Sequence, residues 1–409
     1  AYSISEWFNA EEISKYLSYK GVNIGSLVQD ELINILVNYI KKFFELYKIS
    51  KKVNCTTYVG SYACCEIMKN FSKTTITFKN SKKEVLGQLP LDSNEIKMKI
   101  GTKDHSMKFG ISKNLFKKLK SVSEKSTKLL LSKNNLAKET SQNVLIVEFN
   151  AIQYQSFFEQ MPNSHLNFLT YNRRRPTFWN FQSYNLVKQS GCFVETEDSL
   201  SDTNLKKIIS NGKLETEKQI SNLLSEEVFF QSFFSIHGIS FWFAFKPFFQ
   251  EFLRKRALEF IHEIELFKKL LEKYTFSSVL ILSEVGSNER IALQLSRQKH
   301  IPVCLLQHGA IYDTAEAYDM NVAQGVVPLK SDYYLCWGKI TETYAERLGI
   351  KSEKIHTLGS SVYDKVKFDE QNSSKNDYLV LATSGPTKED TSDLTVGIIE
   401  KNMSAIKKI

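Results

Sequence analysis

The stretch that decides the fold is VLILSEVGSNERIALQLSRQKHIPVCLLQHG, which spans residues 279–309. It begins with an apolar run at 279–282, continues with a helical pattern over 289–299, and reaches a second apolar run at 302–306. Short apolar runs are typical of strands buried in a parallel sheet, and a helix provides the crossover that two parallel strands require. The stretch therefore predicts a β–α–β unit.

The same alternation continues on both sides of this stretch. Further apolar, strand-like segments separated by helical or polar stretches lie at 144–147, 166–170, 192–194, 333–337, 354–358 and 378–382. Strands that alternate with helices indicate the α/β class, with a mostly parallel sheet and right-handed crossovers.

The length of 409 residues exceeds one ordinary domain. We expect a mainly helical N-terminal region over 1–140 and a Rossmann-like domain over 141–330, interrupted by a helical insertion at 205–274. A second Rossmann-like domain is expected over 331–409. Because about eighty residues are too few for a usual nucleotide-binding domain, we expect only part of one there.

The formal net charge is +9 and is carried mostly by scattered lysines. Such a charge favours anionic partners, for example nucleotide phosphates, anionic polymers or an anionic membrane surface, and it also serves solubility. The dispersed charge and the lack of a recognition motif argue against a nucleic-acid-binding protein.

The cysteine pattern and the hydropathy bear on location. None of the six cysteines has zinc-site spacing, so no metal site is predicted, and the pattern is typical of a reducing compartment. No apolar stretch has the eighteen residues of a membrane span, and no signal peptide is visible. We predict a cytoplasmic protein, with the inner face of the membrane as an option.

The option of a location at the membrane depends on the helical insertion. Its centre at 229–252 is crowded with aromatic residues and is followed by Arg254, Lys255 and Arg256. One interpretation is a pair of helices packed on the sheet or on another subunit. The other is a hydrophobic surface for a lipid-linked acceptor or for peripheral membrane contact. The sequence does not predict an oligomeric state.

Two candidate catalytic residues follow the strands of the deciding stretch. Ligands of open parallel sheets bind outside the carboxyl ends of the strands. Glu284 follows the first strand and His308 the second, so both are expected in one crevice, where they suit proton transfer from an acceptor hydroxyl. Gln307 and Gly309 flank His308, and glycine leaves room for a ligand or another loop. Alternatively, His308 caps a strand end and Glu284 caps a helix.

Anion-binding candidates follow other strands. Arg173, Arg174 and Arg175 can hold an anionic sugar, a phosphate or an acceptor, or else form a solvated loop or salt bridges to the insertion. Small residues at two later strand ends can expose backbone N–H groups to a nucleotide phosphate, although they are also ordinary in turns. These are Gly359, Ser360, Ser384 and Gly385.

A family resemblance rests on motifs between residues 279 and 364. In order, they are Gln307-His308-Gly309, Asp332-Tyr333-Tyr334-Leu335-Cys336-Trp337-Gly338, Leu348-Gly349-Ile350, Lys354-Ile355 and Leu358-Gly359-Ser360. This order resembles that of two-domain (GT-B) glycosyltransferases of capsule and surface-polysaccharide synthesis. It is also similar to the transferases that use CDP-glycerol to build teichoic-acid-like polymers.

The resemblance implies a metal-independent enzyme without a cofactor. Such an enzyme would move a sugar or polyol phosphate from a nucleotide-activated donor to a glycan or lipid-linked acceptor. The first half would hold the acceptor and the base, the second half would hold the nucleotide, and His308 would lie in the cleft. The chain departs from the family pattern near its end, where the usual Glu- or Arg-bearing donor segment is not found.

Three alternatives stay open from the sequence. An epimerase of the UDP-N-acetylglucosamine 2-epimerase type shares the architecture and the combination of His with carboxylates. A non-catalytic scaffold of a polysaccharide assembly complex fits the helical N-terminal region and the aromatic insertion. Within an enzyme, the general base could also come from Asp313, Glu316 or Asp319.

Overall fold

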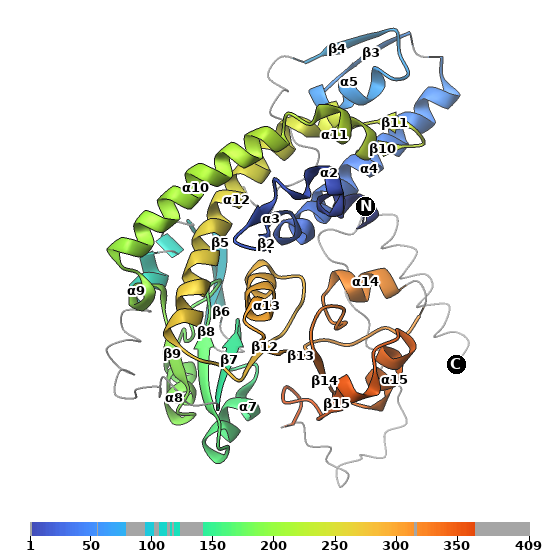
Figure 1. The fold of residues 1–409 in the computed structure, drawn as a ribbon. Coiled ribbons are helices and arrows are strands. Elements are labelled where there is room, and N and C mark those ends of the chain that lie inside the picture. Colours follow the sequence, from blue (N-terminus) through green and yellow to red (C-terminus); the bar gives the residue numbers. More distant parts are fainter. Residues whose placement is uncertain are drawn as a thin grey trace, which may run out of the picture. The chain divides into compact units, whose positions relative to one another are not determined.

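The computed structural model describes residues 2–54, 56–78, 95–101, 106–112, 115–116, 118–122, 142–314 and 317–364. Their central feature is a parallel sheet of seven strands, in the order β15-β14-β13-β12-β7-β8-β9 (Figure 1). The α/β class predicted from the alternating pattern is thereby confirmed. In chain order the strands are β7 (Asn143–Val147), β8 (Asn167–Tyr171), β9 (Phe193–Glu195), β12 (Ser278–Ile281), β13 (Val303–Leu306), β14 (Tyr333–Cys336) and β15 (Ile355–Thr357).

The order of the strands reverses once. From β7 the chain adds β8 and then β9 on one side, and it returns to add β12 on the other side of β7, followed by β13, β14 and β15. The connections of β7 and β12 therefore leave the carboxyl edge in opposite directions. Such a switch point is where open α/β sheets bind ligands.

The predicted domain boundary near residue 330 falls inside this sheet. β13 pairs with β14 in parallel, with Leu305 opposite Tyr334, and β14 pairs with β15. β14 and β15 therefore extend the first sheet, and the second Rossmann-like domain expected over 331–409 stays a prediction. The apolar run of 333–336 forms β14, which pairs with β13, a strand that already belongs to the sheet. The strand predicted at 378–382 lies outside the described residues.

Alternating side chains of the strands belong to two hydrophobic cores, one on each face of the sheet. Leu145 and Val147 of β7 belong to the larger cluster with α12 and α13, whereas Val144 and Ile146 belong to a smaller cluster with α7 and α8. This alternation follows from the two-residue period of a strand. The helices beside the sheet are α7 (Gln155–Gln160), η3 (Met161–Asn163), α8 (Phe181–Gln189), α9 (Glu197–Leu200), α13 (Ser287–Gln298), α14 (Tyr318–Ala323), α15 (Lys339–Arg347) and η5 (Ser352–Lys354).

The range predicted as a helical insertion contains two long helices. It consists of α10 (Thr203–Leu223), α11 (Glu227–Phe233), the short strands β10 (Ser235–Ile236) and β11 (Ile239–Ser240), and α12 (Trp242–Lys273). Its aromatic centre is mostly core, since Phe230, Trp242 and Phe249 are completely buried against one another. Packing thus accounts for most of the aromatic density. No helix in the described part of the chain is long and apolar enough to cross a membrane.

The N-terminal region shares the larger core. The ring of Trp7 packs edge-on against Phe249 of α12 at 5.1 Å between centroids. Its elements are α1 (Tyr2–Ser5), η1 (Trp7–Asn9), α2 (Glu11–Ser14), β1 (Ser18–Tyr19), β2 (Val22–Asn23), α3 (Ile24–Leu27), α4 (Gln29–Lys52), β3 (Thr57–Gly60), α5 (Tyr62–Met68), β4 (Thr74–Thr77), β5 (Glu95–Gly101) and β6 (Ser106–Ser112). Residues 2–54 therefore pack with the sheet domain and not as a separate body.

Candidate functional site

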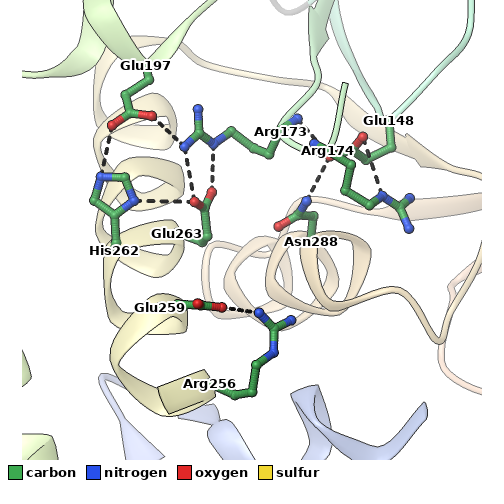
Figure 2. A network of polar contacts seen from close by, with 9 residues as sticks. All are labelled: Glu148, Arg173, Arg174, Glu197, Arg256, Glu259, His262, Glu263 and Asn288. Atoms are coloured by element: carbon green, nitrogen blue, oxygen red, sulfur yellow. Dashed lines mark hydrogen bonds and ion pairs between the residues drawn. The ribbon is translucent and has the colours of Figure 1, made fainter. Parts of the chain in front are cut away.

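The switch point is organised by Glu148, the first residue after β7. Its carboxylate is buried, and Oε1 accepts hydrogen bonds from the backbone N–H groups of Arg173 and Arg174 at 2.7 and 2.9 Å. The same oxygen accepts one from the side chain of Asn288 in α13 at 2.8 Å (Figure 2). Glu148 has a φ of +63°, a conformation that non-glycine residues seldom adopt. One carboxylate thus ties together the ends of β7 and β8 and the start of α13.

Arg173 points into the protein, where Nε and Nη2 are engaged while the buried Nη1 has no hydrogen-bond partner among the described residues. Its guanidinium donates to Glu263 of α12 at 2.6 and 3.0 Å and to Glu197 of α9 at 2.7 Å. His262 contacts both carboxylates, at 3.0 Å to Glu197 and 3.3 Å to Glu263 (Figure 2). Arg173 thus forms salt bridges to the insertion, which is one of the alternative roles that the sequence indicates for the arginine triplet.

The pKa values of this network are strongly shifted. The hydrogen bond from His262 and the nearby Arg173 lower the pKa of Glu197 to about 2, against the effect of burial. Burial raises the pKa of Glu263, but Arg173 and His262 outweigh it and bring it to about 2. The hydrogen bonds to Glu197 and Glu263 raise the pKa of His262 to about 9. At neutral pH the network therefore consists of two cations and two anions, which stabilise one another.

Arg174 lies at the edge of the switch point. Its side chain remains 47% exposed, and it forms ion pairs with Glu148 and with the buried Glu289 of α13. Burial raises the pKa of Glu289 to about 7, with Glu148 adding to the rise and Arg174 opposing it. Burial raises the pKa of the Tyr154 hydroxyl and the nearby charge of Arg175 opposes the rise, so Arg175 lies near Tyr154. Arg174 is thus better placed than Arg173 to meet a ligand.

Glu284 and His308 follow neighbouring strands, as predicted, but no hydrogen bond joins their side chains in the described structure. The buried carboxylate of Glu284 accepts the backbone N–H groups of Lys330 and Ser331, at 2.9 and 2.5 Å. Burial raises its pKa, and these hydrogen bonds oppose the rise. Glu284 therefore fastens the end of β12 to the segment before β14, which favours the structural alternative for this residue.

His308 keeps a free ring nitrogen. Nδ1 is buried and has no hydrogen-bond partner among the described residues. Burial lowers the pKa of the imidazole, and the backbone of Leu282 opposes this effect more weakly. The ring is therefore mainly neutral near pH 7. A neutral imidazole with a free nitrogen at the carboxyl edge of a sheet can accept a proton.

The flanking residues of His308 have different roles. Gln307 is buried, donates from Nε2 to the Gly309 carbonyl at 2.9 Å, and accepts the Trp337 N–H at 2.8 Å. It therefore links the ends of β13 and β14. A side chain at Gly309 would meet only Val326, at an ordinary 3.7 Å. The close approach expected at Gly309 is absent among the described residues.

The later glycine–serine candidates are only partly visible. Gly359, after β15, has a φ of +84° and is exposed, so a left-handed turn is sufficient reason for glycine there. The Oγ of Ser360 is buried and has no described partner. Ser384 and Gly385 lie outside the described residues. Likewise, no group of three metal-ligating side chains occurs in the described ranges.

The alternative bases after His308 are also only partly described. Asp313 forms an ion pair with Arg347 on the surface. Glu316 and the side chain of Asp319 lie outside the described part of the chain. Nothing in the described geometry brings Asp313 to His308.

Sequence reasoning missed Glu148, Asn288 and Glu289. Each lies at a strand end or in the first turn of the following helix, so the strand-end rule could have selected Glu148 directly. Glu289 carries no such signal, because its burial depends on the packing of α13 beside β7.

Comparison with known proteins identifies no relative of this chain. No family model matches it, and neither a curated protein nor a solved structure does. The fold itself defines it as an α/β protein with a seven-stranded parallel sheet.

Proposed function

We propose that this chain is a metal-independent glycosyltransferase of surface-polysaccharide synthesis, with a nucleotide-activated donor and a glycan or lipid-linked acceptor. The observation that carries the proposal is His308, a buried and mainly neutral imidazole with an unpartnered Nδ1 at the carboxyl edge of the sheet. This state suits a general base that takes the proton from an acceptor hydroxyl as the hydroxyl oxygen attacks the donor sugar. The motif order around Gln307-His308-Gly309 supports the same function.

The half-exposed Arg174 supports the proposal independently. It lies at the switch point, where open sheets bind ligands, and a guanidinium group pairs well with phosphate. Glu284 is not part of the proposed chemistry, since two backbone N–H groups already occupy its carboxylate.

The test is nucleotide release from CDP-, CMP-, UDP-, GDP- and dTDP-linked donors, assayed with the full chain and a panel of glycan acceptors. We expect release with one class of donor and a lengthened acceptor. His308→Ala should lower the rate by about 10²–10⁴-fold, the usual contribution of a positioned base. Arg347→Ala, which removes a surface ion pair, serves as the matched control and should leave the rate unchanged.

The other outcomes separate the alternatives. An isomerised nucleotide sugar without an acceptor product would indicate an epimerase. Full cellular function of His308→Ala, with no donor turned over by the wild type, would favour a scaffold. Normal turnover by His308→Ala would remove His308 as the base.

A further inference from the structure

The first turn of α13 has the features of an anion site. This twelve-residue helix begins beside the switch point, and its N-cap residue, Gly286, has no side chain to satisfy the first backbone N–H groups. Such N–H groups, together with the helix dipole, attract negative charge. The side chains around this helix start decide whether it can bind an anion.

Glu289 places an unsatisfied atom at this helix start. Its side chain is 1% exposed, and Oε1 pairs with Arg174, but Oε2 has no hydrogen-bond partner in the described structure. Oε2 lies against Gly286, where any added side chain would collide with it. Leaving a buried polar group unsatisfied costs about 1–3 kcal/mol, so the free oxygen indicates a partner from outside the chain.

One guanidinium group stands next to the same helix start. A Cβ on Gly286 would lie 3.1 Å from Nη1 of Arg174, which places this guanidinium directly at the N-cap. Guanidinium groups and helix N–H groups are the usual ligands of phosphate oxygens.

The charges around Glu289 decide how such a site works. Burial raises the pKa of Glu289 to about 7; Arg174 and the backbone N–H of Glu289 itself oppose the rise, and Glu148 from the end of β7 adds to it. Burial also raises the pKa of Asp30 in α4, and Arg290 and Arg174 oppose that rise. Arg173 is held by Glu197 and Glu263 and does not compete. In its neutral form Glu289 releases Arg174 and offers an O–H donor.

We propose that Arg174, Gly286 and Glu289 form a binding site for a phosphate group, and that binding is coupled to the uptake of one proton by Glu289. Arg174 then exchanges its ion pair with Glu289 for one with the phosphate, and the proton from solvent neutralises the carboxylate left behind. Glu148 keeps its hydrogen bonds to the backbone of Arg173 and Arg174 and holds the loop that carries Arg174 in place. The inference rests on the proposed function only for the source of the phosphate, namely a phosphorylated sugar substrate.

Sulfate is the first probe, measured by titration calorimetry on the full chain. Its charge does not change between about pH 6 and about pH 8, so any pH dependence reports the protein. With a group titrating near 7, affinity should be about tenfold higher at the lower pH. The binding heat in buffers of different ionisation enthalpy should show uptake of up to one proton.

Two variants test the residues. Arg174→Gln removes the half-exposed cation of the site, so it should bind sulfate at least about tenfold more weakly. Glu289→Gln keeps a neutral side chain, so it should bind at about pH 8 as the wild type does at about pH 6, without proton uptake. Arg347→Gln is the matched control and should behave as wild type.

The proposal is overturned if the wild type shows no sulfate binding at either pH, or if Arg174→Gln binds as tightly as wild type. It is also overturned if Glu289→Gln retains the pH dependence. Should Glu289→Gln fail to fold, proton uptake by the wild type and the loss in Arg174→Gln still decide the matter.

Competition against sulfate distinguishes the sources of phosphate. Tighter binding of glucose 1-phosphate or UDP than of inorganic phosphate would assign the site to a substrate, whereas equal binding would assign it to free phosphate. Sulfate binding without any nucleotide release would remove the proposed transferase activity and leave the phosphate site standing.

Discussion

Replacing Arg173 by methionine tests whether the network of Figure 2 stabilises the fold. The guanidinium is 7% exposed and donates three hydrogen bonds to two carboxylates. Removing one partner of a buried ion pair costs about 3–5 kcal/mol, because the remaining charge is left without compensation. His262 still contacts Glu197 and Glu263, so we expect the lower end, about 3 kcal/mol.

Urea unfolding of wild type and Arg173→Met at neutral pH gives this difference. The matched control is Arg347→Met, which breaks an exposed pair with Asp313 and should cost less than about 1 kcal/mol. If Arg173→Met is no less stable than this control, the reasoning about the buried network is wrong.

Unfolding at acidic pH provides a second test with the same variant. The pKa values of Glu197 and Glu263 are lowered from 4.5 to about 2, so their stabilising contribution is complete above about pH 4.5 and disappears as the pH falls through about 2. The stability difference between wild type and Arg173→Met should therefore shrink over this interval. A difference that stays constant would contradict the assignment to these carboxylates.

Three further predictions follow from single residues. Because the pKa of His262 is raised to about 9, its contribution to stability is complete below about pH 6.5 and is lost as the pH rises through about 9. His262→Gln should therefore flatten the plot of unfolding free energy against pH in this range, and an NMR titration of the wild type should give the pKa directly. Phe249→Ala removes a fully buried ring and should lower the free energy of unfolding by about 3–5 kcal/mol in urea, and a loss below about 1 kcal/mol would contradict its core position. Glu284→Gln should cost about 1–3 kcal/mol, because Lys330 and Ser331 lose part of their acceptor, and a pure loss of turnover at unchanged stability would restore Glu284 as a catalytic candidate.

Much of the fold could be predicted because the information is local. The apolar runs at 144–147, 279–282 and 303–306 are mostly buried on both faces of the sheet, and this double burial makes them continuous in sequence. The runs at 303–306 and 166–170 located the strand ends that His308 and the arginine triplet follow. That the strands on the two sides of residue 330 share one sheet could not be predicted in this way, since strands of one long sheet and of two short sheets have the same pattern.

The sequence by itself determined the class of the fold, the positions of its strands and the residues that follow them, because hydrophobic periodicity and strand ends are local properties. Only the tertiary structure decided what those residues do. It paired Arg173 with Glu263, ninety positions away, and Arg174 with Glu289, 115 positions away. It also turned Glu284 towards Lys330 and left Nδ1 of His308 free. The physical reason is that burial and charge pairing depend on which helices pack against which strand end, and no local pattern specifies that.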